Sequence, residues 1–297
     1  MRIFITGSTG FIGSAVVRDL ITAGHTVLGL VRSDANAKAL DAVGGTALRG
    51  DLDDLDVLRR GAESTDGVIH IAFHHDFSNF AECCAKDQRA ITAMGEVLAG
   101  SNRPLVITSG TPVGEGRVVD ESDLGDRKNP ISLLRAPAED IARGFASRGV
   151  RSSIVCLPRC VHGTSEQGWK AGLLIVLTQI AKKTGVVAYI GDGSARWPAV
   201  HRLDAARLYC LAVEKAPAGS RVHAVGEEGI SLKEIAMHLA AKLGLPVVSK
   251  TPGEAAAHFG FFAASVSTDQ PASAPQARAL GWQPREIGLL ADLDANG

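Results

Sequence analysis

The sequence has few of the features that mark secreted, membrane or nucleic-acid-binding proteins. Its five cysteines, Cys83, Cys84, Cys156, Cys160 and Cys210, form no C-x-x-C pair, so we expect reduced thiols in a cytoplasmic protein. No window reaches the roughly 18 uninterrupted apolar residues of a membrane span, and the first residues lack the apolar core of a secretory signal. The 31 basic and 32 acidic residues include no long basic run, which argues against binding to nucleic acid or to anionic lipid.

The nine histidines give little indication of a metal site. There is no H-E-x-x-H pattern, and the adjacent rings of His74 and His75 point apart if the chain is extended there. We therefore expect no metal site.

The chain does contain enough apolar sequence for one large core, or for a domain with a smaller lobe, because 45% of its 297 residues are hydrophobic. In the first half, apolar runs alternate with segments of helical periodicity. We expect strands at residues 2–6, 26–31, 46–49, 67–71, 105–108 and 152–156, and helices at residues 11–23, 35–43, 55–61, 80–99 and 133–147. The strand runs are continuous rather than alternating in polarity, which predicts parallel strands that are covered on both faces. The succession of strands and helices predicts an α/β fold with a doubly wound Rossmann sheet.

After Pro158, the regular alternation of expected strands and helices ends. We expect a polar loop at residues 163–168, strands at residues 186–190 and 200–203, and helices at residues 169–184 and 204–214. Ser231 and Glu234 have the spacing of a capping box at the start of an amphipathic helix that ends at residue 243. Residues 268–277 contain two prolines and should be a loop, and a helical tail follows. This predicts a dinucleotide-binding domain at residues 1–160, to which residues 186–216 return, and a smaller α/β substrate-binding lobe at residues 161–185 and 217–297.

A glycine-rich loop follows the first expected strand and opens the first expected helix. It reads Gly7-Ser8-Thr9-Gly10-Phe11-Ile12-Gly13, a G-x-x-G-x-x-G pattern. Gly7 permits the tight turn out of the strand, Gly10 lets the backbone approach a pyrophosphate, and Gly13 allows the helix to pack closely on the strand. The start of the helix then offers N–H groups and a partial positive charge to the phosphates. In this context the loop predicts a bound nicotinamide dinucleotide.

The end of the second expected strand indicates which dinucleotide is bound. Enzymes that use NAD usually carry Asp or Glu there, which binds the ribose 2′-hydroxyl. This chain reads Leu30-Val31-Arg32-Ser33 instead, and a guanidinium attracts a 2′-phosphate but gains nothing from a bare hydroxyl. We therefore expect NADP(H) to be preferred over NAD(H), with Arg32 and Ser33 at the 2′-phosphate. Asp51 follows the third strand, where a carboxylate can accept a hydrogen bond from the adenine amino group.

Seven short segments of the chain occur in a characteristic order. They are the glycine loop, Gly50-Asp51-Leu52, Val68-Ile69-His70-Ile71-Ala72, Val106-Ile107-Thr108-Ser109, Leu157-Pro158-Arg159-Cys160-Val161-His162-Gly163, Val200-His201-Arg202-Leu203-Asp204-Ala205-Ala206 and Leu280-Gly281-Trp282-Gln283-Pro284. Together they resemble the extended and atypical branches of the short-chain dehydrogenase/reductase superfamily, which includes NAD-dependent epimerases and dehydratases, over nearly the whole length. Beyond the glycine loop, Arg32 and Ser33, the resemblance implies that the cofactor contacts Asp51, Leu52, Ile71, Ala72, Phe73, Ser109, Arg135, Pro158 and Val161.

The expected active site departs from that family. The family uses a serine together with Y-x-x-x-K, whose lysine lowers the pKa of the tyrosine so that the phenol exchanges a proton with the substrate. Glu139 resembles the glutamate that usually follows this lysine by four residues, which places Arg135 at the lysine and Ile131 at the tyrosine. The two tyrosines of the chain, Tyr189 and Tyr209, lie elsewhere. An isoleucine cannot move a proton, and an arginine binds hydroxyls or an oxyanion but stays protonated.

Other residues are therefore candidates for the catalytic work. Ser109 ends the fifth expected strand, where open α/β sheets place their ligands, and Thr111 lies two residues further on. His74 and its neighbour His75 follow the fourth strand, and His162 replaces the tyrosine of a family turn beside the nicotinamide. Histidine as a residue type ordinarily titrates near neutral pH, so each of these is a candidate proton donor, and a solvated or structural role is the alternative for each.

Three functions remain open at this stage. The main hypothesis is an NADP(H)-dependent oxidoreductase that transfers a hydride between the nicotinamide and a carbonyl compound or secondary alcohol, with a small molecule as its partner. The second is a sugar-nucleotide epimerase or dehydratase that retains its cofactor, and the third is a non-catalytic NADP(H)-binding sensor. Trp197 either stacks on the substrate or packs in the smaller lobe. The resemblance implies a homodimer contact through the helices expected at residues 80–99 and 133–147, while the oligomeric state stays open.

Overall fold

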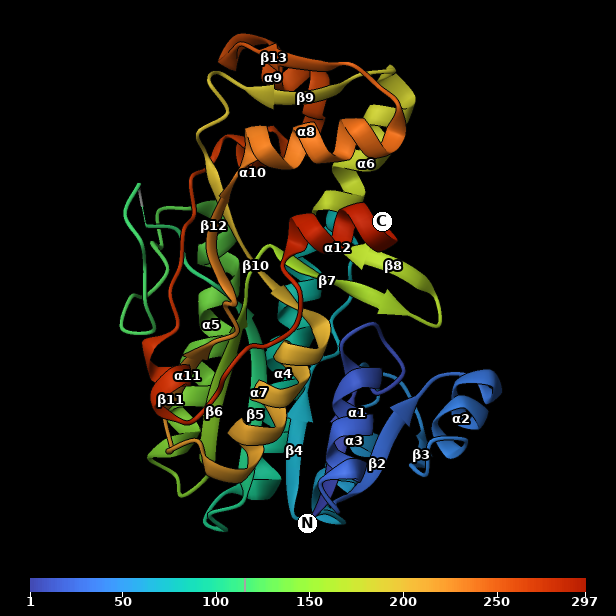
Figure 1. The fold of residues 1–297 in the computed structure, drawn as a ribbon. Coiled ribbons are helices and arrows are strands. Elements are labelled where there is room, and N and C mark those ends of the chain that lie inside the picture. Colours follow the sequence, from blue (N-terminus) through green and yellow to red (C-terminus); the bar gives the residue numbers. More distant parts are fainter. Residues whose placement is uncertain (115) are drawn as a thin grey trace.

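The computed structural model describes residues 1–114 and 116–297, except for the side chains of Phe77, Pro130 and Ile131. Figure 1 shows a large lobe built on one twisted sheet, with a smaller lobe stacked over one end of its strands. The interpretation of Ile131 as the replacement of the family's tyrosine concerns a side chain outside this description.

The large lobe contains a seven-stranded sheet in the order β11-β6-β5-β4-β1-β2-β3. All its neighbouring strands pair in parallel. The strands are β1 (Arg2–Thr6), β2 (Thr26–Val31), β3 (Thr46–Arg49), β4 (Gly67–His70), β5 (Pro104–Gly110), β6 (Arg151–Leu157) and β11 (Ser220–His223). The expected doubly wound α/β fold is therefore confirmed.

Helices cover both faces of this sheet, as the apolar character of its strands requires. One face packs on α1 (Gly13–Thr22), α7 (Arg202–Lys215) and α11 (Pro275–Ala279), and the other packs on α3 (Leu55–Glu63), α4 (Phe80–Leu98) and α5 (Pro130–Ala146). The short helices α2 (Asp34–Asp41) and η1 (Phe77–Asn79) lie at the sheet's edge and before α4. Each face thus has its own buried core, with Leu20 and Leu208 in the first and Met94 and Phe145 in the second.

The smaller lobe has two small sheets and a core of its own. Its strands are β7 (Cys160–Ser165), β8 (Gly168–Ala171), β10 (Arg196–His201) and β12 (Glu227–Ser231) in one sheet, and β9 (Val187–Ile190) and β13 (Val247–Lys250) in the other. Its helices are α6 (Leu174–Thr184), α8 (Leu232–Leu243), α9 (Pro252–Phe259), η2 (Gly260–Phe262), α10 (Ala263–Ser267) and α12 (Leu289–Asn296). The capping box of Ser231 and Glu234 is present at the start of α8. Leu174, Trp197 and Leu239 belong to this third core.

The structure corrects the expected boundaries in three places. Residues 163–168 do not form one loop, because β7 and β8 pair there as an antiparallel hairpin whose turn is at residues 166–167, just before Gly168 (φ +89°). The helix expected from residue 169 begins only at Leu174. Strand β9 pairs with β13, so the return to the large lobe does not begin at residue 186. Strand β11 pairs with β6 in the main sheet, so the smaller lobe does not begin at residue 217. Local periodicity cannot reveal these pairings, because each joins segments that are distant in the sequence or separated by a short turn.

Within the part of the chain that the structure describes, no helix is both long enough and apolar enough to cross a membrane. All five cysteines are buried as free thiols.

Candidate functional site

A cavity of about 980 Å³ opens at the carboxyl ends of β1, β2, β4 and β5, where the order of the strands reverses around β1. This is the place where open α/β sheets bind their ligands. The residues of the cofactor and catalytic predictions that line it are Gly7, Thr9, Gly10, Phe11, Ile12, Gly13, Arg32, Asp51, Leu52, Ile71, Ala72, Phe73, His74, Ser109 and Arg135.

The glycine loop has the shape that a dinucleotide requires. Gly7 has a φ of +73°, and a Cβ there would lie 2.9 Å from the backbone nitrogen of Ala72. A Cβ on Gly13 would lie 2.0 Å from the carbonyl oxygen of Gly7, so only glycine lets α1 start this close to β1. At Gly10, by contrast, a Cβ would come within 4 Å of one described heavy atom outside the adjoining residues, the Gly7 oxygen at 3.2 Å. Gly10 therefore leaves the backbone open toward the cavity, and the start of α1 directs its partial positive charge there.

Arg202 holds the glycine loop against the smaller lobe. Its guanidinium donates to the carbonyl oxygen of Phe11 (2.8 Å), to the hydroxyl of Ser14 (2.8 Å) and to the carbonyl oxygen of Thr164 in β7 (2.7 Å). It also lies 5.0 Å from the centre of the Phe11 ring. This side chain joins the cofactor-binding loop to the lobe that closes the cavity.

Two features of the cavity lie at the end that the adenosine half of a dinucleotide would occupy. Arg32 follows β2 and is exposed, and among the described residues no carboxylate oxygen lies within 4.0 Å of its guanidinium. Asn36, in the first turn of α2, lines the cavity beside it. Ser33 does not line the cavity, because its hydroxyl caps α2 by accepting from the backbone N–H of Asn36 (3.2 Å).

His74 lies toward this end of the cavity rather than toward Ser109. Its Nε2 atom is 4.0 Å from Oδ1 of Asp51, beyond β3 at the far edge of the sheet. The expected role of His74 as a proton donor to a substrate at Ser109 does not fit this position. Its neighbour His75 packs edge-on against the ring of Phe73, and burial lowers the pKa of its imidazole.

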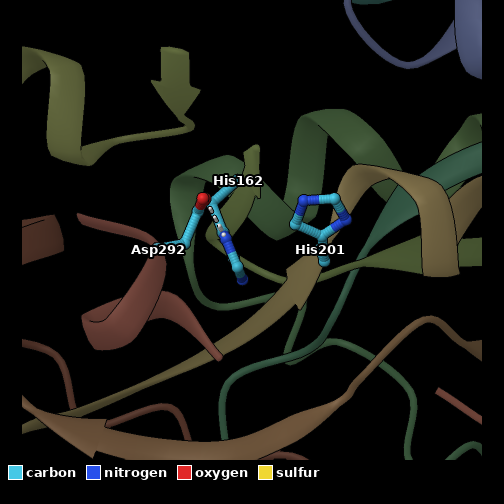
Figure 2. A group of neighbouring side chains, drawn as sticks. All are labelled: His162, His201 and Asp292. Atoms are coloured by element: carbon cyan, nitrogen blue, oxygen red, sulfur yellow. Dashed lines mark hydrogen bonds and ion pairs between the residues drawn. The ribbon is translucent and has the colours of Figure 1, made fainter. Parts of the chain in front are cut away.

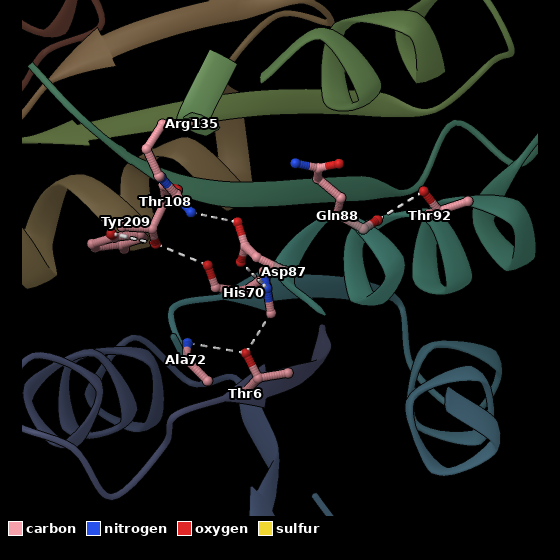
Figure 3. Close-up of polar contacts among 9 residues, drawn as sticks. All are labelled: Thr6, His70, Ala72, Asp87, Gln88, Thr92, Thr108, Arg135 and Tyr209. Carbon is pink, nitrogen blue, oxygen red and sulfur yellow. Dashed lines mark hydrogen bonds and ion pairs between the residues drawn. The ribbon is translucent and has the colours of Figure 1, made fainter. Parts of the chain in front are cut away.

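At the other end of the cavity, Arg135 is anchored by a buried carboxylate (Figure 3). Its Nη1 donates to Oδ2 of Asp87 (2.7 Å), and its Nη2 donates to the carbonyl oxygen of Thr108 (3.1 Å). The guanidinium also stacks on the ring of Phe73, 4.7 Å from its centre. These two hydrogen bonds use two of the five N–H donors of an arginine, and the guanidinium also lines the cavity wall.

Asp87 is in turn held by His70, as Figure 3 shows. Oδ1 of Asp87 lies 3.0 Å from Nε2 of His70, and Nδ1 of His70 lies 2.7 Å from the hydroxyl of Thr6. The Thr6 hydroxyl accepts from the N–H of Ala72 (3.2 Å). If His70 carries its proton on Nε2, it donates to Asp87 and accepts from the hydroxyl of Thr6, so these contacts form one continuous series of hydrogen bonds. Burial raises the pKa of Asp87, but the His70 hydrogen bond and the charge of Arg135 outweigh burial and hold that pKa below its ordinary value.

Ser109 is paired with an acidic residue that the sequence analysis used only to set the register. Its hydroxyl donates to Oε1 of Glu139 over 2.6 Å. The other carboxylate oxygen of Glu139 lies 3.3 Å from Nε of Arg221, whose side chain is only 5% exposed. Glu139 lies one helical turn after Arg135 on α5, so both residues project from the same helix face toward the end of β5. The serine therefore has a direct proton acceptor, which lies on the helix that lacks the tyrosine.

Tyr209 does not replace the missing tyrosine. Its phenol lies on the far side of the sheet, 2.7 Å from the hydroxyl of Thr108, which donates to the carbonyl oxygen of His70 (2.8 Å). This series of hydrogen bonds ends at the backbone carbonyl of His70, which does not exchange protons. Burial also raises the pKa of Tyr209 well above its ordinary value.

Several predicted residues lie outside the main cavity. Ser8 is buried and donates to the carbonyl oxygen of Leu30, while Pro158 and Val161 are buried between the lobes. Thr111 lines a hollow of about 100 Å³ on the far side of Ser109 instead. In each case the backbone follows the expected path but the side chain faces the protein.

His162 is the clearest departure from the expected site. It is fully buried in β7, and its Nδ1 lies 2.7 Å from Oδ2 of Asp292 in α12. Figure 2 shows the pair beside His201, whose ring centre is 5.2 Å from that of His162. Oδ2 of Asp292 also accepts from Nε1 of Trp169 (2.7 Å), so this pair fastens the last helix to the smaller lobe.

One of the missed residues had a signal in the sequence. Asp87 stands within the apolar stripe of α4, which includes Cys83, Cys84, Ala90 and Ile91 on the buried face. A carboxylate within such a stripe needs a buried partner, and it therefore indicates a polar network. The pairing of Ser109 with Glu139 had no such signal, because it depends on how α5 is placed over β5.

The chain was compared with known proteins. The sequence model of the NAD dependent epimerase/dehydratase family matches residues 3–226. An uncharacterized protein of Schizosaccharomyces pombe is 48% identical over 99% of this chain and 98% of its own length. The 2-alkyl-3-oxoalkanoate reductase of Stenotrophomonas maltophilia is 29% identical over 84% of this chain and 78% of its own length.

Solved structures show the same fold. The UDP-glucose 4-epimerase of Thermus thermophilus, solved in complex with NAD, superposes with a TM-score of 0.77 at 20% identity. The match covers 100% of this chain and 97% of that one. At this level of identity the likeness establishes the fold alone.

Proposed function

Because the chain belongs to the NAD-dependent epimerase/dehydratase family, we propose that it is an NADP(H)-dependent oxidoreductase that interconverts a carbonyl compound and a secondary alcohol. The observation that carries the proposal is the single cavity that joins the glycine loop and Arg32 at one end to Ser109 and Arg135 at the other. The names of relatives such as the 2-alkyl-3-oxoalkanoate reductase support a reductase.

The residues of the cavity fit a dinucleotide phosphate. The loop from Gly7 to Gly13 and the start of α1 would hold the pyrophosphate, and Asp51 would accept from the adenine amino group. Arg32 has no competing carboxylate partner among the described residues, so its donors are available to a 2′-phosphate. When bound, the cofactor supplies or accepts a hydride at C4 of its nicotinamide ring.

Arg135 stabilises negative charge on the substrate oxygen in this proposal. Asp87 and the carbonyl of Thr108 fix its guanidinium at the cavity wall, so the charge does not have to be reoriented during the reaction. An arginine stays protonated, and Arg135 therefore positions and polarises but does not transfer the proton.

The proton moves between the substrate oxygen and Glu139 by way of Ser109. In alcohol oxidation, the substrate hydroxyl gives its proton to Oγ of Ser109 while Ser109 gives its own proton to Oε1 of Glu139, 2.6 Å away. In carbonyl reduction, the same two transfers run in reverse and end with a neutral alcohol. On the other side of Glu139, Nε of Arg221 lies 3.3 Å from Oε2. This pair supplies the acid and base function that Ile131 cannot provide.

An epimerase or dehydratase that retains its cofactor is the second candidate, because the fold and the family also include such enzymes. The two candidates differ in how the cofactor is held. An oxidoreductase exchanges NADP(H) with solution at each turnover, whereas an epimerase of this kind is purified with its dinucleotide bound.

The cofactor part of the proposal is tested by titrating NADPH and NADH into the wild-type protein and into the Arg32→Ala variant. We expect NADPH to bind the wild type at least about tenfold more tightly than NADH, because a charge-assisted bond to phosphate contributes about 1.5–3 kcal/mol. Arg32→Ala should remove that preference by weakening NADPH alone. Arg49→Ala is the matched control, because Arg49 is an exposed neighbour at the end of β3 that is paired with Asp34. Equal affinities for the two cofactors in the wild type would refute the NADP(H) preference.

A further inference from the structure

Arg159 lies in the short connection between β6 and β7, where the chain crosses from the large lobe to the smaller one. It follows Leu157, which lines the main cavity, by two residues. Its Nε donates to the side-chain carbonyl of Gln270, and its Nη1 donates to the backbone carbonyl of Ser265. Within the described residues no carboxylate oxygen lies within 4.0 Å of this guanidinium, so both contacts are to neutral oxygens.

The surroundings of Arg159 do not neutralise its charge. Burial lowers the pKa of its guanidinium to about 10, because the surrounding protein replaces part of the water that would solvate the cation. Arg202, the other arginine between the lobes, uses Nε, Nη1 and Nη2 in hydrogen bonds. Toward the residues that the structure describes, Arg159 uses Nε and Nη1 alone, and the residue remains partly exposed. A partly buried cation with donors to spare is an unfavourable arrangement unless an anion completes it.

A second unsatisfied donor lies beside this guanidinium. The Arg159 guanidinium carbon is 5.5 Å from the centre of the Trp197 ring. Trp197 is fully buried, and its Nε1 has no hydrogen-bond partner among the described residues. A buried indole N–H without an acceptor costs free energy, so the Trp197 ring beside the guanidinium also carries a donor that the described residues leave unsatisfied.

The position is linked to the reactive end of the cavity through Gln270. The side-chain amide of Gln270 donates to the carbonyl oxygens of Thr111 and Pro112, while its own carbonyl accepts from Arg159. Thr111 lies two residues after Ser109, and its N–H donates to the carbonyl of Leu157 (3.0 Å). Gln270 therefore joins Arg159 to the end of β5 that carries Ser109, and a substrate at Ser109 would have to extend on this side to reach the guanidinium.

We propose that Arg159 binds a carboxylate of the substrate, so that the substrates are oxo acids and the corresponding hydroxy acids. A guanidinium is suited to this task, because its fork of N–H donors matches the two oxygens of a carboxylate. This inference rests on the proposed oxidoreductase function and adds the chemical class of the substrate.

The test measures the binding of simple carboxylates to the full-length protein by calorimetry. The probes are hexanoate and benzoate, each compared with its neutral amide at an ionic strength held constant with sodium chloride. The titrations are made with and without saturating NADPH on the wild type and on Arg159→Gln, Arg159→Lys and Arg278→Gln. Arg278→Gln is the matched control, because Arg278 also lies over a tryptophan, 5.6 Å from the ring centre of Trp282, but in α11.

We expect the wild type to bind at least one carboxylate about tenfold more tightly than its amide, a difference that Arg278→Gln retains and Arg159→Gln removes. Arg159→Lys should keep the charge but lose the paired hydrogen bonds, and should retain only part of the difference. Equal binding of acid and amide by the wild type, no binding of either acid, or an unchanged preference in Arg159→Gln would each overturn the inference. If Arg159→Gln does not fold, Arg159→Lys takes its place in the test. A preference for acid over amide that is unchanged in Arg159→Lys would then overturn the inference. Failure of NADPH to bind refutes the proposed function instead, and the titrations without cofactor still judge Arg159.

Discussion

The buried carboxylate of Asp87 is the point at which stability and activity are most closely joined. Its side chain is 5% exposed and accepts hydrogen bonds from both Arg135 (2.7 Å) and His70 (3.0 Å). The substitution Asp87→Asn keeps the shape of the side chain but removes its charge. It leaves the Arg135 cation, 19% exposed, without a counter-charge.

The expected loss of stability follows from that burial. Removing one partner of a buried ion pair costs about 3–5 kcal/mol, and the partial exposure of Arg135 places Asp87→Asn near the lower end of that range. Asp140→Asn is the matched control, because Asp140 also pairs with arginines, Arg127 and Arg143, but is 39% exposed. A surface pair of this kind contributes under about 1 kcal/mol. Urea unfolding of the three proteins at neutral pH measures both values.

The loss of stability in Asp87→Asn should depend on pH. The pKa of Asp87 is lower in the folded protein than its ordinary value near 3.8, because His70 and Arg135 outweigh the effect of burial. Its contribution to stability is therefore fully present above the ordinary pKa and is lost as the pH falls through the folded pKa. The gap in unfolding free energy between wild type and Asp87→Asn should shrink in acid. A gap no larger than that of Asp140→Asn at neutral pH would refute the view that Asp87 anchors Arg135.

Two further predictions concern the glycine loop and the proton path. Gly13→Ala should weaken NADPH binding at least about tenfold in calorimetry, because its Cβ would lie 2.0 Å from the Gly7 oxygen and would push α1 away from β1; unchanged binding would contradict the role of this contact. Glu139→Gln should lower kcat by about 10²–10⁴, the range of general acid–base catalysis, while Tyr209→Phe leaves kcat unchanged. Steady-state kinetics with a carbonyl substrate compares the two, and a larger loss in Tyr209→Phe would show that the proton does not pass from Ser109 to Glu139.

The fold could be predicted from the sequence because its signals are local. The apolar runs of β1 and β2 and the glycine loop each lie within a few consecutive residues, and the bounds Arg2–Thr6 and Thr26–Val31 were predicted without error. The hairpin of β7 and β8 was missed because its short strands carry too few residues for a period, and only pairing between them stabilises the extended chain.

The candidate site could be predicted only in part, for a physical reason. Residues whose backbone faces the ligand, such as Gly10, keep their position whatever the side chains around them do. Side chains that can choose among several partners cannot be placed in this way. His162 was expected in the cleft, but Asp292, 130 residues further along the chain, holds it in the smaller lobe. Ser109 was expected from the resemblance, whereas its partner Glu139 depends on the packing of α5 against β5.

If this protein transfers a hydride between NADP(H) and a substrate that it then releases, a label at C4 of the cofactor must appear in the released product. The most direct test incubates the protein with NADPH carrying deuterium at C4 and a panel of aldehydes, ketones and oxo acids, and follows the label by mass spectrometry. We expect deuterium on the carbinol carbon of at least one alcohol product, with one equivalent of NADP⁺ formed per alcohol. Tight binding of NADPH with no deuterium in any product would contradict this expectation.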